Sequence, residues 1–362
     1  AMPGILFDAL RMMTQSDSPI SIHPAYLPRV LPWLLRNVLQ SRRSVVNCNA
    51  EHLHALSQHA VASWQQLISK SNLASLFRTT GWLKVYESEK SFASSLTSQQ
   101  LIDQRGTPYD LLNAAEIGDL EPNLDPIFKH GLYQQDCMSV SKLERLVKGF
   151  GRQMLDSGGA SRPFAVDQIV VTDDGINLKG LGGNLSADKI VIAAGVWSRS
   201  LASQLDDNIP LDTERGYHLM MPRGNQNLLS RPVLNKDSSF VLCRIKTGLR
   251  MTAQVKLAGL DITPNFNKIR SLVPAAKRML PKLDTQKQSE WMGFRPSLPD
   301  SLPALGFSSK TDNVLYAFGH QHLGMTLAAI TSQVIAVLVA NRKHRSTWPR
   351  IARLDLSHSE RL

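Results

Sequence analysis

The sequence is poor in cysteine and in long apolar runs, and each deficit removes a class of protein. Its three cysteines, Cys48, Cys137 and Cys243, lie far apart and form no CxxC pair, which excludes a cysteine zinc site and a disulfide framework. No apolar run reaches about eighteen residues, so we expect no membrane-spanning helix. The first residues also lack the charged start and apolar core of a signal peptide. These deficits predict a protein of a reducing compartment, the cytoplasm.

The sequence also lacks the motifs of several common cofactor, catalytic and metal sites. Gly149-Phe150-Gly151 falls within a helical pattern, and Gly180-Leu181-Gly182-Gly183 precedes a strand. Neither is a dinucleotide fingerprint, because that motif lies between a strand and the following helix. No G-x-S-x-G occurs, which removes a hydrolase with a nucleophile elbow. His320 and His322 have no third ligand at a recognisable spacing, so we expect no metal site.

Aromatic residues are scarce, at 6%, whereas basic residues give a formal net charge of +11. Such a charge suits nucleic acid, an anionic membrane surface or an acidic substrate. The densest basic clusters, Arg42-Arg43 and Arg342-Lys343-His344-Arg345, have no interleaved aromatic residues on which bases could stack. We therefore expect no nucleic-acid partner.

Residues 22–46 are divided by prolines and contain an apolar helical pattern around Trp33. Arg36, Arg42 and Arg43 form its polar edge. A tryptophan beside a cationic edge suits the lipid interface, and it equally suits an ordinary helix packed on a core. We favour the packed helix and keep open a peripheral contact with the inner face of the membrane.

Helical and strand patterns are mixed along the 362 residues, which are enough for two domains. The patterns predict helices at 50–78, 88–117, 141–155, 197–205 and 264–280. They predict strands at 80–86, 131–133, 168–172, 175–181, 189–194, 217–221, 233–234, 240–244 and 250–255. Two interleaved domains fit this order better than two sequential ones.

The most informative stretch is residues 291–326. A hydrophobic strand from Val314 to Phe318 runs into Gly319, and a helical pattern follows from Met325 to about Ala340. A strand, a glycine turn and a helix start together present free backbone N–H groups to a negatively charged partner. Arg295 lies just before this unit on an expected turn. The stretch therefore predicts half of a cofactor and substrate site.

Four segments carry a family resemblance: IVIAAGVWSRSLA, IPLDTERGYHLMMP, WMGFRPSLPDSLPALG and GHQHLGMTLAAITSQVIAVLV. In this order and spacing they resemble the FAD-dependent oxidoreductases of the D-amino-acid oxidase superfamily. The nearest branch holds the D-amino-acid and D-hydroxyproline dehydrogenases, with glycine oxidase and sarcosine oxidase as more distant relatives. The resemblance covers most of the chain.

The resemblance implies a mixed α/β (α+β) fold, in which an FAD-binding α/β layer is interleaved with a large, mostly antiparallel substrate-domain sheet. It assigns 1–80 to a helical region attached to the FAD domain, 81–138 and 209–300 to the substrate domain, 139–208 and 301–345 to the FAD domain, and 346–362 to a tail. Family members open with a strand and a GxGxxG turn, and this sequence starts some tens of residues after that βαβ unit. We therefore expect this chain to bind FAD poorly or not at all.

Site residues follow from the same resemblance. Arg295 is expected to hold the substrate carboxylate, with Tyr217 assisting. The expected FAD-binding residues are Val166, Ala194, Gly195, Trp197, Gly319, His320, His322, Leu323, Gly324, Met325 and Thr326. Family members often carry a glycine and a glutamate in the stretch where this chain has residues 252–256. No catalytic side chain is named, because hydride transfer needs positioning more than a strong base.

The implied activity is oxidation of the C–N bond of a small amino or imino acid, either a D-amino acid or a hydroxyproline-like one, by hydride transfer to flavin N5. Electrons would pass to a quinone, a carrier protein or oxygen. The alternative is a truncated, non-catalytic homologue that acts as a binding or partner subunit.

Overall fold

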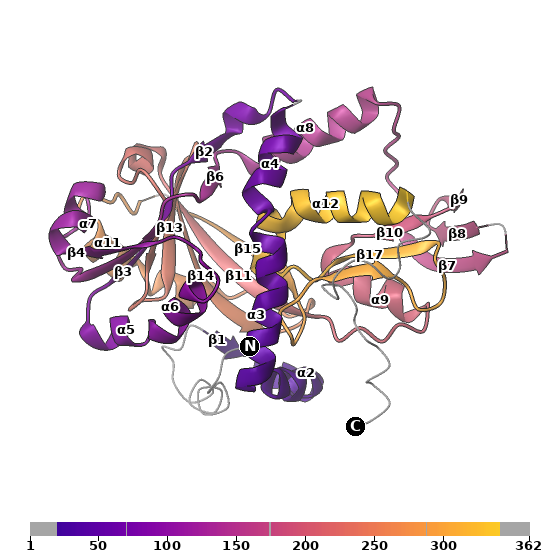
Figure 1. Cartoon of the computed structure of the whole chain (residues 1–362), viewed down its shortest axis with the longest axis horizontal. Helices are drawn as coiled ribbons and strands as arrows, with labels where there is room; N and C mark the ends of the chain where they lie inside the picture. The colour runs from indigo at the N-terminus through magenta and orange to yellow at the C-terminus, as the bar shows by residue number, and fades with distance from the viewer. Residues whose placement is uncertain (1–19, 70, 174, 287, 341–362) are drawn as a thin grey trace.

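The computed structural model describes residues 20–340 except 70, 174 and 287, and Figure 1 shows a large sheet on one side and smaller sheets on the other. Helices lie between and around these sheets. The predicted tail at 346–362 and the basic cluster at 342–345 lie outside the described residues. The mixed α/β class predicted from the sequence is confirmed.

The large sheet has the strand order β15-β11-β14-β13-β12-β3-β5-β4, with β1 pairing beside β14. Its strands are β1 (Ile20–Ile22), β3 (Trp82–Tyr86), β4 (Asp110–Asn113), β5 (His130–Gln134), β11 (Asp212–Met221), β12 (Val233–Asn235), β13 (Phe240–Ile245), β14 (Gly248–Leu257) and β15 (Ser289–Ser297). Neighbouring strands are antiparallel except for the β12–β3 and β1–β14 pairs. This sheet draws on two separate stretches of the chain.

One face of the large sheet is packed and the other is open. Tyr217, Leu219 and Met221 alternate along β11 into a hydrophobic core. Side chains at every second position of a strand point to one face, so His218 and Met220 point to the opposite face. The core also includes residues of α7 (Ala114–Leu120), α10 (Asn267–Arg270) and α11 (Val273–Met279). We call this the packed face, and the other the open face.

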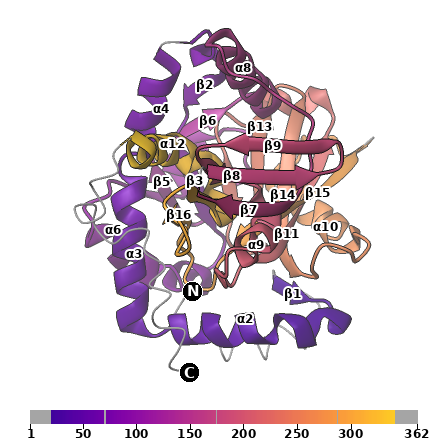
Figure 2. The ribbon, with the colours of Figure 1, turned by 90° about the vertical axis from the view of Figure 1, so that its right-hand side faces the viewer.

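Two three-stranded sheets form the other side of the molecule; Figure 1 shows β10 and β17 of one, and Figure 2 shows the strands of the other, β7 to β9. One contains β10 (Ile190–Ile192), β17 (Val314–Phe318) and β16 (Ala304–Phe307); the other is the meander of β7 (Val166–Thr172), β8 (Gly175–Gly180) and β9 (Gly183–Ala187). β10 and β17 are parallel, with Ile190 beside Val314. Their carboxyl ends therefore meet at one edge, where helix α9 (Ser198–Ser203) follows β10 and α12 (Gly324–Ala340) follows β17.

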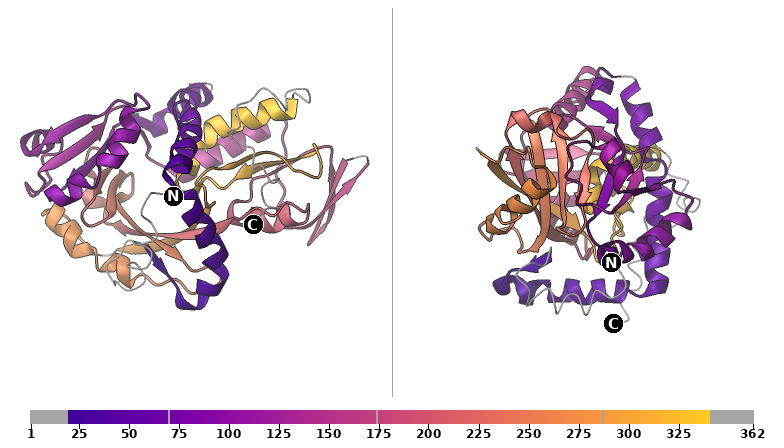
Figure 3. Two further views of the ribbon diagram at one scale, coloured as in Figure 1. Left: turned by 60° about the horizontal axis from the view of Figure 1, so that its bottom comes forward. Right: turned by 90° about the vertical axis from the view of Figure 1, so that its left-hand side faces the viewer.

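The N-terminal helices α2 (Leu27–Gln40), α3 (Arg43–Ser57) and α4 (Ala60–Ser69) run along the side of the molecule (Figure 3, indigo). Helix α12 packs against α3 and α4 in the interior. The remaining elements are η1 (Pro24–Tyr26), η2 (Ala74–Leu76), β2 (Phe77–Thr79), α5 (Glu89–Ala93), α6 (Leu96–Asp103), β6 (Met138–Val140), α8 (Leu143–Asp156), η3 (Gly195–Trp197), η4 (Arg223–Asn227) and η5 (Gln321–Leu323).

Two secondary-structure predictions are wrong. The predicted helix 88–117 is interrupted by β4, because Asn113 caps a new helix: its side chain accepts from the N–H groups of Ala115 and Glu116. Arg295 lies within strand β15 and not on a turn. The following Pro296 is tolerated there because β15 is an edge strand.

The expectation about apolar runs also needs correction. Among the described residues, one helix, Gln321–Ala340, is long and apolar enough to cross a membrane by length and composition alone. The sequence analysis missed this helix because a few serine, threonine and glutamine residues interrupt its apolar run. In the fold it packs on other helices, and Leu327 and Ala329 are fully buried.

Candidate cofactor and substrate site

The edge where β10 and β17 end brings two predicted turns together. β10 leads into Ala194 and Gly195, and β17 leads into Gly319. Gly195 has a φ of 58° and no atom within 4 Å of the position a Cβ would take, so a ligand could approach its backbone closely. In open α/β sheets, ligands bind in the crevice at the carboxyl ends of parallel strands.

The start of α12 is held by contacts from distant parts of the chain. Gly319 has a φ of 84°, and Gln321 also has a positive φ while its Nε2 donates to the Leu298 carbonyl at 3.2 Å. The Trp64 indole of α4 donates to the carbonyls of Met325 and Thr326, at 3.0 and 3.2 Å. The N–H groups of the first turn of a helix have no partners within that helix. An anion at this position would meet those donors and the positive end of the helix dipole.

Both histidines of this unit have lowered pKa values. Burial lowers the pKa of His320 to about 4, and its Nε2 lies 3.0 Å from Thr331 Oγ1. Burial, and then the charge of Arg295, lowers the pKa of His322. Neither histidine therefore adds a cation at neutral pH, and no cluster of three metal-ligating side chains occurs in the described part of the chain.

Arg295 extends over the open face of the large sheet. It is paired with Glu214 of β11, and a Cβ at Gly216 would collide with its guanidinium. Its Nη1 donates to the Gln254 carbonyl at 3.2 Å. Strand β15 contacts the η5 turn that precedes α12, and the charge of Arg295 contributes to the lowered pKa of His322 in that turn. The predicted substrate arginine and the predicted cofactor helix thus face the same space.

Two residues beside Arg295 were missed by the sequence analysis. Burial raises the pKa of the Glu214 carboxyl, against the opposing effect of Arg295. Gln254 has a φ of 73°, and its buried Nε2 has no partner among the described residues. Non-glycine residues with positive φ cluster at functional sites. The sequence analysis noted that residues 252–256 differ from the family pattern. That difference pointed to strand β14, but not to Gln254.

Tyr217, the second predicted substrate residue, lies on the packed face. It is 1% exposed and its ring packs edge-on against Phe266 with centroids 5.4 Å apart. Its hydroxyl is buried without a partner in the described structure. The structure therefore places Tyr217 and Arg295 on opposite faces of the sheet, and a role for Tyr217 stays a prediction.

Trp197 and Val166 were also predicted to bind the cofactor, and the structure places them in different surroundings. Trp197 is 59% exposed and its ring lies edge-on to Phe294 of β15, with centroids 6.2 Å apart. Val166 begins β7 and packs against the core that β10 and β17 share. Trp197 thus lies close to the large sheet, whereas Val166 lies in the β7–β9 meander.

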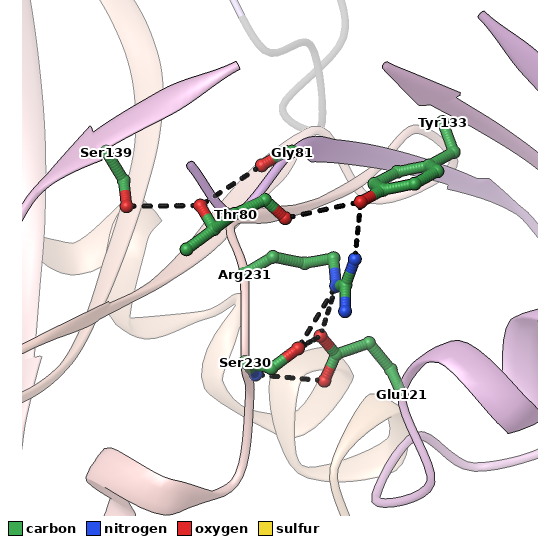
Figure 4. A network of polar contacts seen from close by, with 7 residues as sticks. All are labelled: Thr80, Gly81, Glu121, Tyr133, Ser139, Ser230 and Arg231. Carbon is green, nitrogen blue, oxygen red and sulfur yellow. Dashed lines mark hydrogen bonds and ion pairs between the residues drawn. The ribbon is translucent and has the colours of Figure 1, made fainter. Parts of the chain in front are cut away.

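A cleft of about 1770 Å³ opens between the large sheet and helices α4 and α8, and it reaches Met325 and Thr326 at the start of α12. Behind its wall, Arg231 binds Glu121 at 2.8 Å and the Tyr133 hydroxyl at 2.7 Å (Figure 4). The guanidinium also lies 5.1 Å from the Tyr133 ring centre. This network fixes Pro232 and the ends of β3 and β5, which line the cleft.

The arrangement fits an extended, anionic cofactor. The helix start offers backbone donors, Gly195 leaves its backbone accessible, and the cleft exceeds the roughly 300–1,000 Å³ of common ligand pockets. A helix start that faces an arginine across the end of a sheet is an arrangement that a flavin-dependent oxidoreductase could use. Residues 21–338 match the family model described as FAD dependent oxidoreductase, and the chain belongs to that family.

Named relatives agree with the resemblance. The chain is 28% identical to a D-amino-acid oxidase of Bradyrhizobium diazoefficiens over 94% of this chain and 80% of that one. It is also 28% identical to a D-amino acid dehydrogenase of Vibrio cholerae, over 93% and 81%. Glycine oxidase from Geobacillus kaustophilus shares the fold, with a TM-score of 0.73 at 20% identity, over 82% of each chain. The predicted superfamily and its FAD dependence are confirmed.

Proposed function

We propose that this protein oxidises the C–N bond of a small D-amino or imino acid. The observation that carries the proposal is Arg295, which lies on the open face of the sheet near the η5 turn and has only one carbonyl partner among the described contacts. Its planar guanidinium can bind a carboxylate with two parallel hydrogen bonds. The α-carboxylate of an amino acid held there would lie beside the start of α12.

FAD would be held by the edge where β10 and β17 end. Ala194 and Gly195 would approach its phosphates, and residues 319–326 would lie against its ring system. FAD supplies the acceptor for the hydride that leaves the α-carbon. The helix start would favour the negative charge that arrives with the hydride, because the positive end of the helix dipole lies there.

The chain's own charges also favour the reactive form of the substrate. The amine must be neutral to release a hydride and become an iminium, which water then hydrolyses to a keto acid and ammonia. Arg295 and Arg250 are cations on this face, and burial keeps His218 neutral by lowering its pKa to about 4. A cationic environment disfavours a protonated amine, so no strong protein base is required.

The direct test is oxidation of D-alanine, D-proline and glycine by the FAD-saturated protein, with oxygen and a redox dye as alternative acceptors. We expect release of the keto or imino product in proportion to the electrons transferred. If FAD binds and no amino acid is oxidised with either acceptor, the alternative of a non-catalytic binding or partner subunit is supported instead. The FAD content of the purified chain, measured by fluorescence, tests the expectation of poor or absent FAD binding separately.

A specific observation also supports the peripheral membrane contact. Leu31, Leu35 and Leu39 are 48%, 58% and 38% exposed and lie four residues apart on the outer side of α2, which Figure 2 shows along one side of the molecule. Arg29 and Arg36 flank this stripe, and residues 18–50 contain no acidic side chain. An exposed apolar stripe with cationic edges suits an anionic lipid surface, on the cytoplasmic side.

Vesicle binding tests this contact. Binding to phosphatidylserine-containing vesicles should exceed binding to neutral vesicles and weaken with salt. Leu35→Asp should reduce binding, whereas the matched change Leu111→Asp, at a residue 52% exposed on β4, should not. Equal partitioning into both vesicle types, or equal losses in both variants, would contradict the contact.

A further inference from the structure

Two paired glycines leave a hollow on the open face of the large sheet. Gly216 of β11 lies directly beside Gly293 of β15, and residues paired across antiparallel strands point to the same face. Arg295 leans into this hollow, and its guanidinium occupies the place that a Cβ of Gly216 would take. Trp291 leans in as well, and its six-membered ring occupies the corresponding place at Gly293. Glycine within a strand often marks such a close approach.

The guanidinium and the indole are therefore neighbours in this hollow. The Cβ positions of two directly paired residues lie about 5 Å apart, and each of the two groups fills one of those positions. A carboxylate bound to Arg295 would lie about 2.8 Å from the guanidinium nitrogens. The side chain of an amino acid starts only two bonds from its carboxyl carbon. An amino acid held by Arg295 can thus place its side chain against the indole of Trp291.

His218 supports the indole from within the sheet. It pairs directly with Trp291, and the two rings stack with their centres 4.9 Å apart. Burial, followed by the charge of Arg250, lowers the pKa of His218 to about 4, so the stacked pair carries no charge at neutral pH. Trp291 is nevertheless 57% exposed. An aromatic side chain that is held in place and still exposed beside the substrate arginine is available to a ligand.

The hollow therefore offers one cation beside one apolar surface. A ligand that carries a carboxylate and an apolar group matches both, because the guanidinium binds the carboxylate and the indole covers the apolar group. A charged or strongly polar group placed on the indole face would lose its hydration and gain no partner there. The chemistry of the hollow thus favours an apolar side chain on the acid that Arg295 holds.

We propose that Trp291 binds the side chain of the substrate while Arg295 holds the α-carboxylate, and that Trp291 thereby selects amino or imino acids with an apolar side chain. This inference rests on the proposed function and deepens it, since it names the substrate class. D-valine is preferred over D-threonine, in which a hydroxyl replaces one methyl group. It is also preferred over glycine, which has no side chain to place on the indole. Trp291 is then a specificity-determining residue of the open face.

Binding can be measured without turnover, on carboxylates that lack the amine. Isovalerate has the carbon skeleton of valine, and calorimetry with excess FAD present should show that it binds more tightly than acetate. Trp291→Ala should weaken isovalerate binding by about ten-fold and leave acetate binding nearly unchanged. Trp291→Phe should restore part of the difference, and melting temperatures check that the variants fold. Leu111→Ala is the matched control, because Leu111 is 52% exposed on β4, the opposite edge strand of the same sheet.

Kinetics separate this inference from the proposed function. The ratio of kcat/KM for D-valine to that for D-threonine should exceed one, fall in Trp291→Ala and persist in Leu111→Ala. If amino acids are oxidised but Trp291→Ala keeps the ratio, or weakens isovalerate and acetate equally, the role of Trp291 is refuted and the proposed function stands.

Two other outcomes have distinct meanings. If Trp291→Ala lowers FAD affinity, measured by flavin fluorescence, and keeps the preference for isovalerate, the indole covers the cofactor and the inference is refuted. If isovalerate binding depends on Trp291 as expected but no amino acid is oxidised, the proposed function fails, and the hollow binds apolar carboxylates for another purpose.

Discussion

Arg215 and Arg295 lie on neighbouring strands of the large sheet but point to opposite faces. Arg215, on the packed face, is 0% exposed and donates to the carbonyls of Gly259, Ala258 and Ile262. Its guanidinium also lies 5.6 Å from the ring centre of Phe294. Arg295 has one carbonyl partner, Gln254, and faces the start of α12. Donors that are already occupied hold the fold, whereas free donors are available to a ligand.

The largest expected effect is on the packed face. Arg215→Ala should lower the free energy of unfolding by about 3–5 kcal/mol, because the carbonyls of Ala258, Gly259 and Ile262, the first two of them buried, lose their donors. Urea unfolding followed by circular dichroism measures this. A loss below about 1 kcal/mol would show that water replaces the guanidinium, and the contrast between the faces would fail.

For Arg295 we expect a loss of substrate binding and little loss of folding stability. Arg295→Ala should cost about 2–5 kcal/mol of binding for a carboxylate substrate, with little change in melting temperature or FAD content. Arg295→Lys should recover only part, because a point charge replaces a planar fork. The decisive comparison is between an amino acid and its decarboxylated amine. Equal losses on both substrates, or unfolding, would make Arg295 a structural residue like Arg215.

The pH dependence of stability gives a second contrast, between the carboxyl groups of Asp207 and Glu214. Burial opposes ionisation of Asp207, but hydrogen bonds from Ser308, Ser309 and Tyr316 outweigh it and lower its pKa. Its stabilising effect is therefore present above its ordinary pKa of about 4 and is lost as the pH falls through the folded value. Glu214, whose pKa is raised by burial, instead loses stability as the pH rises.

Single substitutions separate the two carboxyl groups. Asp207→Asn should cost about 2–3 kcal/mol at neutral pH and flatten the acid side of the stability profile. Glu214→Gln should flatten the fall in stability towards neutral pH. Urea midpoints measured from about pH 3 to 7 test both signs. A profile with the two roles exchanged would contradict the assignment of Asp207 as a hydrogen-bonded carboxylate and of Glu214 as a carboxyl group that burial disfavours when ionised.

The smallest effect is expected at Gly216. A Cβ there would meet the Arg295 guanidinium, so Gly216→Ala should displace the arginine and cost about 1–2 kcal/mol of substrate binding. Gly224→Ala is the control, because its Cβ would have no neighbour within 4 Å. Competition by a carboxylate inhibitor measures both variants, and equal inhibition constants would place the substrate carboxylate elsewhere.

Local patterns explain which features the sequence could reveal. The β17–Gly319–α12 unit was predicted because a strand, a turn and a helix follow each other directly in the chain. Strands β13 and β14 were predicted for the same reason. By contrast, β4 lies within a stretch of helical periodicity, and its identity depends on pairing with β5 and on the cap at Asn113.

The two faces of the large sheet could not be predicted, because they depend on strand register. Tyr217 and Arg295 are both polar-tipped side chains in predicted functional segments, but the pairing of Glu214 with Arg295 sends Tyr217 to the packed face. A shift of one residue in that pairing would exchange the faces. The carbonyl partners of Arg215 likewise come from the loop after β14, more than forty residues away.

The Trp64 indole has a consequence for the order in which the protein is made. Its hydrogen bond to Met325 joins residues 261 positions apart. At the usual rates of translation, roughly 13 to 52 seconds separate the synthesis of these two residues. Throughout that interval α4 can already pack on Leu76 and Leu146, which share its core cluster, but the part of its surface that α12 covers stays exposed. The start of α12, although it is built from a few adjacent residues, is therefore among the last parts of the nascent chain to reach its place.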